Sequence, residues 1–330
     1  MHVPLWVWLA TVAGIIALFV FDFFSHVRKP HEPSFKEAAA WSCAYIALAL
    51  VFGAGLWLVW GAQRGAEYFA GFITEKSLSV DNLFVFVIIM AKFAVPRVHQ
   101  QKALLIGIVI ALIMRGIFIA VGAAAIHQFS WVFYIFGAFL LWTAYKLGKE
   151  GFEDNNEEEE EYRPNLAVRL AQRWLPATEQ YHGQRLIAKV DGKRLVTPLF
   201  MVVVALGFTD LLFALDSIPA IYGLTREPYI VFTANAFALL GLLQLYFLLG
   251  GLLSRLVYLG LGLSVILGFI GVKLVLDALH ANTLPFINGG HPIESIPEIP
   301  IWLSMSVIVG ALVVTSVASL IKDRRDRARA

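Results

Sequence analysis

Two stretches of this chain repeat one arrangement of acidic residues inside otherwise apolar sequence. In each stretch a first acid is followed six positions later by a second acid, and then by a small polar residue. The paired positions are Glu75, Asp81 and Asn82 in the first stretch and Asp210, Asp216 and Ser217 in the second. Carboxylate, amide and hydroxyl oxygens are hard donors that suit Mg²⁺, Ca²⁺ or Mn²⁺. These six residues are therefore the candidate metal ligands.

The cost of burying charge favours a cation site over purely structural ion pairs. A charged residue in the middle of a membrane span costs about 2.5 kcal/mol or more. Lys76, Arg115 and Lys273 also lie within apolar stretches, and pairing each with one acid leaves one of the four carboxylates over. Carboxylates that crowd together share protons or bind a cation. Since neither cysteine nor histidine occurs in the two stretches, Zn²⁺, Cu⁺ and Ni²⁺ are disfavoured.

Helical geometry restricts how the acids can share one ion. On an unbroken helix Glu75 and Asp81 would lie about 120° apart, so both could not easily hold the same ion. Two arrangements remain open. The helix breaks between the acids, which Pro219 favours in the second stretch, or Asp81 of one stretch meets Asp216 of the other.

The elements that carry these residues are predicted to be transmembrane helices. Of the 330 residues, 59% are hydrophobic and 15% are charged, whereas soluble domains have about 25% charged residues. Because backbone polar groups in lipid must be satisfied within the segment, each long apolar stretch is expected to be helical. The nine predicted spans are about 4–22, 38–60, 66–91, 103–126, 130–148, 197–222, 228–250, 256–278 and 299–321.

The distribution of basic residues predicts the orientation in the membrane. Of 26 lysines and arginines, 21 fall in connections on one side, and only Arg64 and Arg226 fall on the other. Basic residues are enriched on the cytoplasmic side, so we expect an inner-membrane protein with its N-terminus outside and its C-terminus inside. The longest connection, 149–196, contains an acidic run at 153–161 and is interpreted as a solvated cytoplasmic linker, with metal sensing or docking as the alternative.

The duplicated acidic pattern predicts an internal repeat. The third to fifth spans, about 66–148, would correspond to the sixth to eighth, about 197–278. An odd number of helices in each unit makes the second copy enter the membrane from the opposite side. The prediction is a single membrane domain, 1–330, with an inverted 3+3 helix repeat and a site near the midplane.

Several residues and motifs are expected to have no direct role. The single cysteine, Cys43, excludes an internal disulfide and is expected to be a small buried packing residue. Asp22 and Glu67 lie near span ends, where Glu67 would be solvated and Asp22 would sit in the interface or contribute to function. The sequence has no nucleotide-binding or hydrolase motif, so we expect that the protein is not an enzyme and has no resident cofactor. We also expect no nucleic-acid partner.

The acidic stretches resemble the two signatures of the TerC family. The matching residues are Glu75-Lys-Ser-Leu-Ser-Val-Asp-Asn-Leu-Phe-Val-Phe86 and Phe213-Ala-Leu-Asp-Ser-Ile-Pro-Ala-Ile221, and they resemble the Alx-like bacterial branch of that family. The resemblance implies a role in Mn²⁺ export and tellurium resistance for a protein of this kind, and roles for the six candidate ligands. Gly207 and Leu243 stand where family members often have Glu and Arg, so selectivity or coupling could differ.

The function expected from the sequence is secondary transport that exports divalent cations, with Mn²⁺ first and Ca²⁺ or Mg²⁺ as alternatives. Protons are the expected counter-ion because the same carboxylates would take up protons when the metal leaves. The alternative is a non-transporting membrane factor that supports metalation, assembly or stress resistance. The sequence leaves stoichiometry, coupling ion and oligomeric state open.

Overall fold

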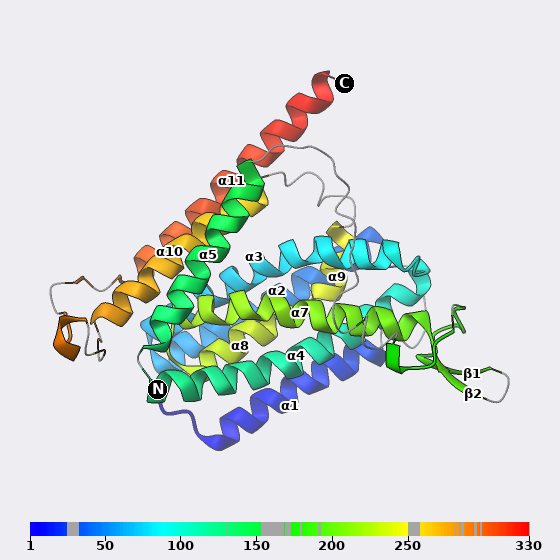
Figure 1. Cartoon of the computed structure of the whole chain (residues 1–330), viewed down its shortest axis with the longest axis horizontal. Helices are drawn as coiled ribbons and strands as arrows, with labels where there is room; N and C mark the ends of the chain where they lie inside the picture. The colour runs from blue at the N-terminus through cyan, green and yellow to red at the C-terminus, as the bar shows by residue number, and fades with distance from the viewer. Residues whose placement is uncertain are drawn as a thin grey trace.

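The computed structural model shows an almost entirely helical chain (Figure 1). It describes residues 1–24, 33–129, 131–152, 168, 173–178, 180–190, 193–249, 258–280, 282, 284, 287–293, 296–297 and 299–329. The side chain of Asp81 and the acidic run at 153–161 lie outside what is described.

Each of the nine predicted spans is helical over most of its described residues. The helices are α1 (Leu5–Asp22), α2 (Phe35–Trp60), α3 (Ala62–Lys92), α4 (Arg97–Gln128), α5 (Val132–Phe152), α7 (Pro198–Tyr222), α8 (Pro228–Leu239), α9 (Leu242–Leu249), α10 (Leu259–His280) and α11 (Ile301–Arg329). Local signals define several starts: Ser34 accepts a hydrogen bond from the Glu37 amide before α2, and a proline begins α7 and α8.

Within the described residues, seven spans are long and apolar enough to cross a membrane. They comprise α1, α2, α4, α7, the α8–α9 segment, α10 and α11. The remaining predicted spans are α3 and α5. The middle of α3 carries Glu75, Lys76 and Asp81, so its composition is less apolar even though it is helical throughout.

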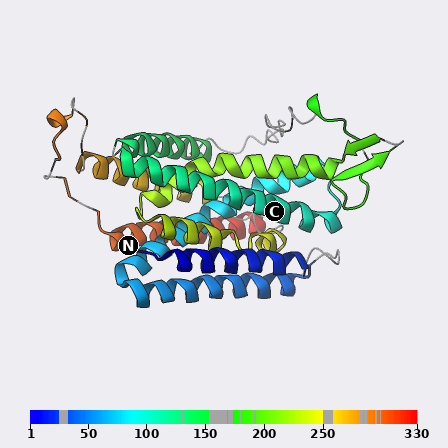
Figure 2. The same ribbon diagram turned by 90° about the horizontal axis from the view of Figure 1, so that it is seen from below.

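The helices form two groups. In Figure 1, α5, α10 and α11 rise obliquely from the end of the molecule where the N-terminus lies, and the other helices run nearly horizontally. Among the described elements, α5 packs most extensively against α10, followed by α4 against α7 and α3 against α8. Figure 2 shows α1 and α2, in blue, along one edge of the molecule. Helices α3 and α7 are therefore central.

The backbone break lies in the seventh predicted span rather than in the acidic ones. Helix α8 ends at Leu239 and α9 begins at Leu242, with Gly241 at a φ of +77° between them. Gly tolerates this left-handed conformation because it lacks a Cβ. Of the two arrangements that the sequence left open, the break beside Pro219 is contradicted, because α7 continues helically through that proline, and α3 is also unbroken.

The connection 149–196 is more than a solvated linker. Its later part forms the antiparallel strands β1 (Ile187–Val190) and β2 (Lys193–Val196). Before them, Tyr181 donates a hydrogen bond of 2.6 Å to the Phe93 carbonyl, and Lys102 donates one of 2.8 Å to the Gln184 carbonyl. This segment therefore docks on the turn between α3 and α4.

The outer helices expose apolar side chains, as expected for a surface in contact with lipid. Leu58 on α2 is 85% exposed, and Val314 on α11 is 66% exposed. Cys43 also lies on the exposed face of α2, so the expectation that it is buried was wrong. A small apolar stretch gives no sign in sequence of which helix face looks outward.

Candidate functional site

Arg115 organises a buried polar cluster where four helices meet. Its guanidinium on α4 is 0% exposed and binds Asp210 of α7 through both carboxylate oxygens, at 2.8 and 3.0 Å. The same group donates to Glu75 of α3. Further donations of 3.2 Å reach the Ser217 hydroxyl on α7 and the Asn235 side-chain oxygen on α8. One arginine thus joins the first acids of both duplicated stretches.

Helical spacing explains which members of the two stretches enter this cluster. Asp210 and Ser217 are seven residues apart, which at about 100° per residue returns to nearly the same face of α7. Both therefore reach Arg115. Asp216 is turned by about 100° from Ser217 and faces another helix. Because α7 is unbroken, Asp210 and Asp216 point about 120° apart, as expected for residues six positions apart on a helix.

The cluster leaves buried polar atoms unused. With both acids ionised, two carboxylates against one guanidinium give a formal charge of −1. Glu75 is 0% exposed, and its second oxygen, Oε2, accepts no hydrogen bond from the residues that the structure describes. The Thr74 hydroxyl and the Asn235 side-chain nitrogen are likewise buried without a described partner. Such groups are costly to bury unless something binds them.

Of the other three candidate ligands, the structure describes the side chains of Asp216 and Asn82. Asp216 is partly buried and accepts a hydrogen bond of 3.2 Å from Thr143 on α5. Asn82 is buried in α3. Asp81 lies in α3, but its side chain is outside the described part, so its predicted meeting with Asp216 stays a prediction.

The three intramembrane cations do not pair one to one with the acids. Arg115 takes two carboxylates, as its need for a buried partner suggested. Lys76 instead donates to the backbone carbonyls of Ala238 and Leu240, at 3.0 and 3.3 Å. Lys273 donates at 2.6 Å to the Gly223 carbonyl and lies 3.4 Å from Asp277.

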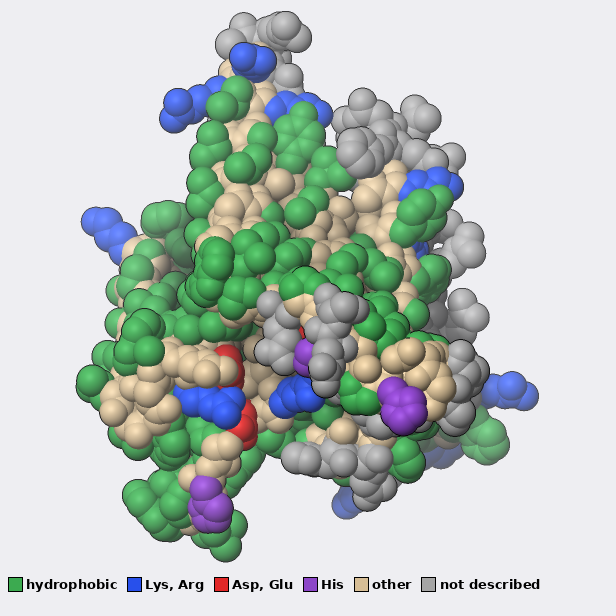
Figure 3. Space-filling view, turned by 90° about the vertical axis from the view of Figure 1, so that its left-hand side faces the viewer, with side chains coloured by type: hydrophobic (Ala, Val, Ile, Leu, Met, Phe, Trp, Pro, Cys, Tyr) green, Lys and Arg blue, Asp and Glu red, His purple; other side chains and the backbone are tan. Residues whose placement is uncertain are grey.

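A polar cavity of about 390 Å³ opens near the N-terminal end of α3. It is lined by α3, by the connection between α7 and α8, and by α10. Acidic and basic side chains lie next to one another on this end of the molecule, as Figure 3 shows. The cavity lining includes Arg64, Glu67, Glu227, Lys273 and Asp277.

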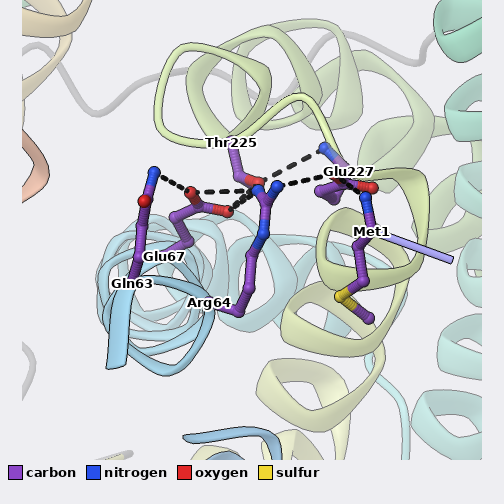
Figure 4. A network of polar contacts seen from close by, with 6 residues as sticks. All are labelled: Met1, Gln63, Arg64, Glu67, Thr225 and Glu227. Atoms are coloured by element: carbon purple, nitrogen blue, oxygen red, sulfur yellow. Dashed lines mark hydrogen bonds and ion pairs between the residues drawn. The ribbon is translucent and has the colours of Figure 1, made fainter. Parts of the chain in front are cut away.

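Glu67 belongs to a network of polar contacts in this region. The expectation that it is solvated was wrong. It is only 5% exposed and contacts Arg64 at 2.9 Å, while the Thr225 hydroxyl donates to it at 2.6 Å (Figure 4). Arg64 also contacts Glu227 at 2.9 Å. These contacts join α3 to the α7–α8 connection. A single acid near a span end gives no signal in sequence that would reveal such a network.

Asp22 is buried rather than interfacial. It is 2% exposed, and it accepts hydrogen bonds from the Tyr45 hydroxyl and, at 3.4 Å, from Gln244. These contacts connect α1, α2 and α9, so the side chain contributes to packing of the edge helices.

The described residues contain no cluster of three or more carboxylate, imidazole or thiol side chains arranged around one point. The described donor set is therefore a pair of carboxylates held by one guanidinium, with hydroxyl and amide groups around it. All of its oxygens are hard donors. The two carboxylates can bind or release a cation or a proton, and the hydroxyl and amide oxygens can add donors for a cation.

The comparisons with known proteins agree with the sequence resemblance. The family model described as integral membrane protein TerC family matches residues 60–327. An uncharacterized membrane protein of Mycobacterium tuberculosis is 48% identical over 314 residues, covering 95% of this chain and 78% of the relative. Alx of Escherichia coli, named provisionally as a membrane-bound redox modulator, is 36% identical, covering 92% and 90%.

A plant relative is also similar. The chloroplastic thylakoid membrane protein TERC of Arabidopsis thaliana is 40% identical over 258 residues, covering 78% of this chain and 65% of the relative. No solved structure matches the chain.

Proposed function

This chain belongs to the TerC family of integral membrane proteins, and from that premise we propose that it is a secondary transporter that exports divalent metal cations, with Mn²⁺ as the first candidate. The observation that carries the proposal is the buried Glu75–Arg115–Asp210 cluster. It joins equivalent acids from both duplicated stretches in the interior of a membrane protein.

The charge of the cluster supports a cation as the cargo. Its formal charge of −1 attracts a cation, and in the interior of a membrane protein that attraction is weakly screened. The unused Oε2 of Glu75 is a hard oxygen donor of the type that Mn²⁺, Mg²⁺ or Ca²⁺ accepts. Protons compete for the same carboxylates, which makes them the proposed counter-ion. The metal is cargo, so the proposal includes neither a resident cofactor nor an enzymatic reaction.

An inverted repeat would explain how the site is exposed to each side in turn. In Figure 1, α3 and α7 run in opposite directions, as do α4 and α8, and α5 and α10. If α3 corresponds to α7 and α4 to α8, a two-fold axis relates the contact of α4 with α7 to the contact of α8 with α3, and both pairs pack together. Rocking of one repeat against the other is the usual motion of such transporters.

Export also requires an orientation. We place the N-terminus and the cavity at Glu67 outside and the docked hairpin β1–β2 in the cytoplasm, on the basis of the 21 basic residues on that side. Glu67 and Glu75 are eight residues apart on α3, or about 12 Å along its axis. The cavity would then serve as the external release route in an inner membrane.

The alternative proposal is a non-transporting membrane factor that supports metalation, assembly or stress resistance. It is favoured by the way Arg115 holds both acids, which a structural role also explains. The name of the Escherichia coli relative refers to redox modulation; this chain has one cysteine and cannot form an internal dithiol.

Metal flux into sealed vesicles that contain the purified full chain tests these alternatives. We expect Mn²⁺ movement above that of protein-free vesicles, and slower movement of Zn²⁺ and Ni²⁺. Mn²⁺ that binds to the protein without crossing the membrane would favour the non-transporting factor. Faster Zn²⁺ than Mn²⁺ movement would contradict the argument from hard donors.

A further inference from the structure

Lys76 places its ammonium at the end of an interrupted helix. The residue lies in the middle of α3, and its nitrogen is 3.0 Å from the Ala238 carbonyl oxygen and 3.3 Å from that of Leu240. Those carbonyls terminate α8, just before Gly241 takes its positive φ. Lys76 therefore binds the backbone of another helix at the point where that helix stops.

The end of α8 is an electrostatically negative position. The last carbonyls of a helix lack partners within it, and the helix dipole concentrates partial negative charge there. In the interior of a membrane protein such groups must be satisfied by something. Discontinuous helices in transporters use these carbonyls to bind cations. An ammonium and a metal cation fit this position for the same reason.

This position also lies beside the acidic cluster. Asn235, whose side-chain oxygen accepts a hydrogen bond from Arg115, precedes Ala238 by three residues on α8. That spacing corresponds to about 4.5 Å along the helix axis. Lys76 itself directly follows Glu75, whose Oε2 accepts no hydrogen bond from any described residue.

We propose that the carbonyls of Ala238 and Leu240 form a cation-binding position, which Lys76 fills in this conformation and which the transported divalent metal ion takes when it displaces the ammonium. The inference rests on the proposed transport function. Lys76 is then a tethered competitor of the metal, because a dication and an ammonium repel each other at such short range. A purely structural lysine would cap α8 in every state, and the metal would not compete with it for these carbonyls.

Equilibrium Mn²⁺ binding to the purified full chain tests the proposal. In Lys76→Met the competing charge is gone, and we expect Mn²⁺ to bind at least about tenfold more tightly than in the wild type. Lys76→Gln removes the same charge and keeps a donor for the carbonyls, so it gives the same test if the methionine variant is poorly folded. Lys76→Arg keeps the charge and should bind like the wild type.

Lys273→Met is the matched control. Lys273 is a buried lysine that, like the partly buried Lys76, donates to a helix-end carbonyl, that of Gly223, but it lies by the outer cavity. Its removal should change Mn²⁺ affinity much less than removal of Lys76. Unchanged or weaker Mn²⁺ binding in both Lys76→Met and Lys76→Gln would overturn the proposal. If the wild type itself neither binds nor moves Mn²⁺, the proposed function fails as well, which the wild-type measurement reports separately.

Discussion

Arg115 is the residue on which the buried cluster depends. It supplies the described hydrogen bonds that neutralise Asp210, and it also binds Glu75, Ser217 and Asn235. Bidentate arginine–carboxylate pairs are among the stronger hydrogen-bonded contacts. Removing the guanidinium leaves two carboxylates facing each other without a counter-ion, which is the costly way to break a buried pair.

Arg115→Met should therefore destabilise the protein by about 3–5 kcal/mol. Thermal unfolding in detergent measures this as a large fall in Tm. The triple variant Arg115→Met, Glu75→Gln, Asp210→Asn removes the charges together and should recover most of the loss. Arg64→Met should cost less than Arg115→Met, because the Arg64 side chain is 29% exposed and water can replace part of its lost contacts. A single Arg115→Met variant as stable as the wild type would contradict the role assigned to Arg115.

The acids of the cluster should matter for transport more than for folding. Glu75→Gln and Asp210→Asn keep size and hydrogen-bonding oxygens but remove charge. A lost charged contact of about 1.5–3 kcal/mol predicts Mn²⁺ affinity reduced by about 10-fold to 100-fold. Vesicle flux at several Mn²⁺ concentrations checks this, with Glu153→Gln in the connection as the control. Wild-type flux in both variants would exclude the cluster as the ion site.

Asp81 and Asp216, the second acids of the two stretches, allow an independent test of the transport route. Asp81→Asn and Asp216→Asn should each abolish Mn²⁺ flux, because each removes a negative charge proposed to bind the ion. The protein should stay inserted and abundant, because a neutral amide is cheaper to bury than a carboxylate. Flux and protein amount are measured together in the same vesicles. Normal flux in both variants would show that these acids are not part of the transport route.

At the level of elements, the crossing of α5 and α10 depends on two glycines. A Cβ at Gly137 would lie 2.7 Å from a Val275 methyl and 3.0 Å from the Gly271 carbonyl oxygen. A Cβ at Gly271 would in turn lie 3.1 Å from the Gly137 carbonyl oxygen. Small residues let membrane helices approach this closely. The close packing of α5 against α10 therefore requires a glycine on each helix.

Gly137→Val should separate these helices and destabilise the protein by about 1–3 kcal/mol, the usual cost of overpacking. Gly55→Val in α2 is the control, because a Cβ there meets nothing within 4 Å. Unfolding in detergent compares the two variants. Equal stability of Gly137→Val and Gly55→Val would mean that the close α5–α10 contact is not needed.

At the level of the whole molecule, the proposed orientation can be tested with reporters. A reporter fused after Lys322, or inserted within 149–196, should read cytoplasmic. One at residue 1 or near Gly289 should read external, because basic residues are concentrated in the opposite set of connections. A cytoplasmic signal near Gly289 would be incompatible with nine spans and with the inverted repeat.

The membrane class, the approximate positions of the helices and the family could be predicted from the amino-acid sequence alone. A long apolar stretch that crosses lipid must satisfy its backbone hydrogen bonds internally, which is why each predicted span is helical over most of its described residues. The acids were found for the same reason, since charges stand out against an apolar background. The angular separation of acids on one helix also followed from helix geometry alone.

Tertiary structure decided which polar groups meet. The sequence could not show that Arg115 would bridge Glu75 and Asp210, that Glu67 would be buried, or that Lys76 would reach the end of α8. These contacts depend on how helices distant in sequence are rotated and packed, and mean hydropathy carries little information about rotation. The location of the backbone break also depended on the tertiary structure. Pro219 lies inside a continuous α7, and the chain breaks at Gly241, where glycine allows a positive φ.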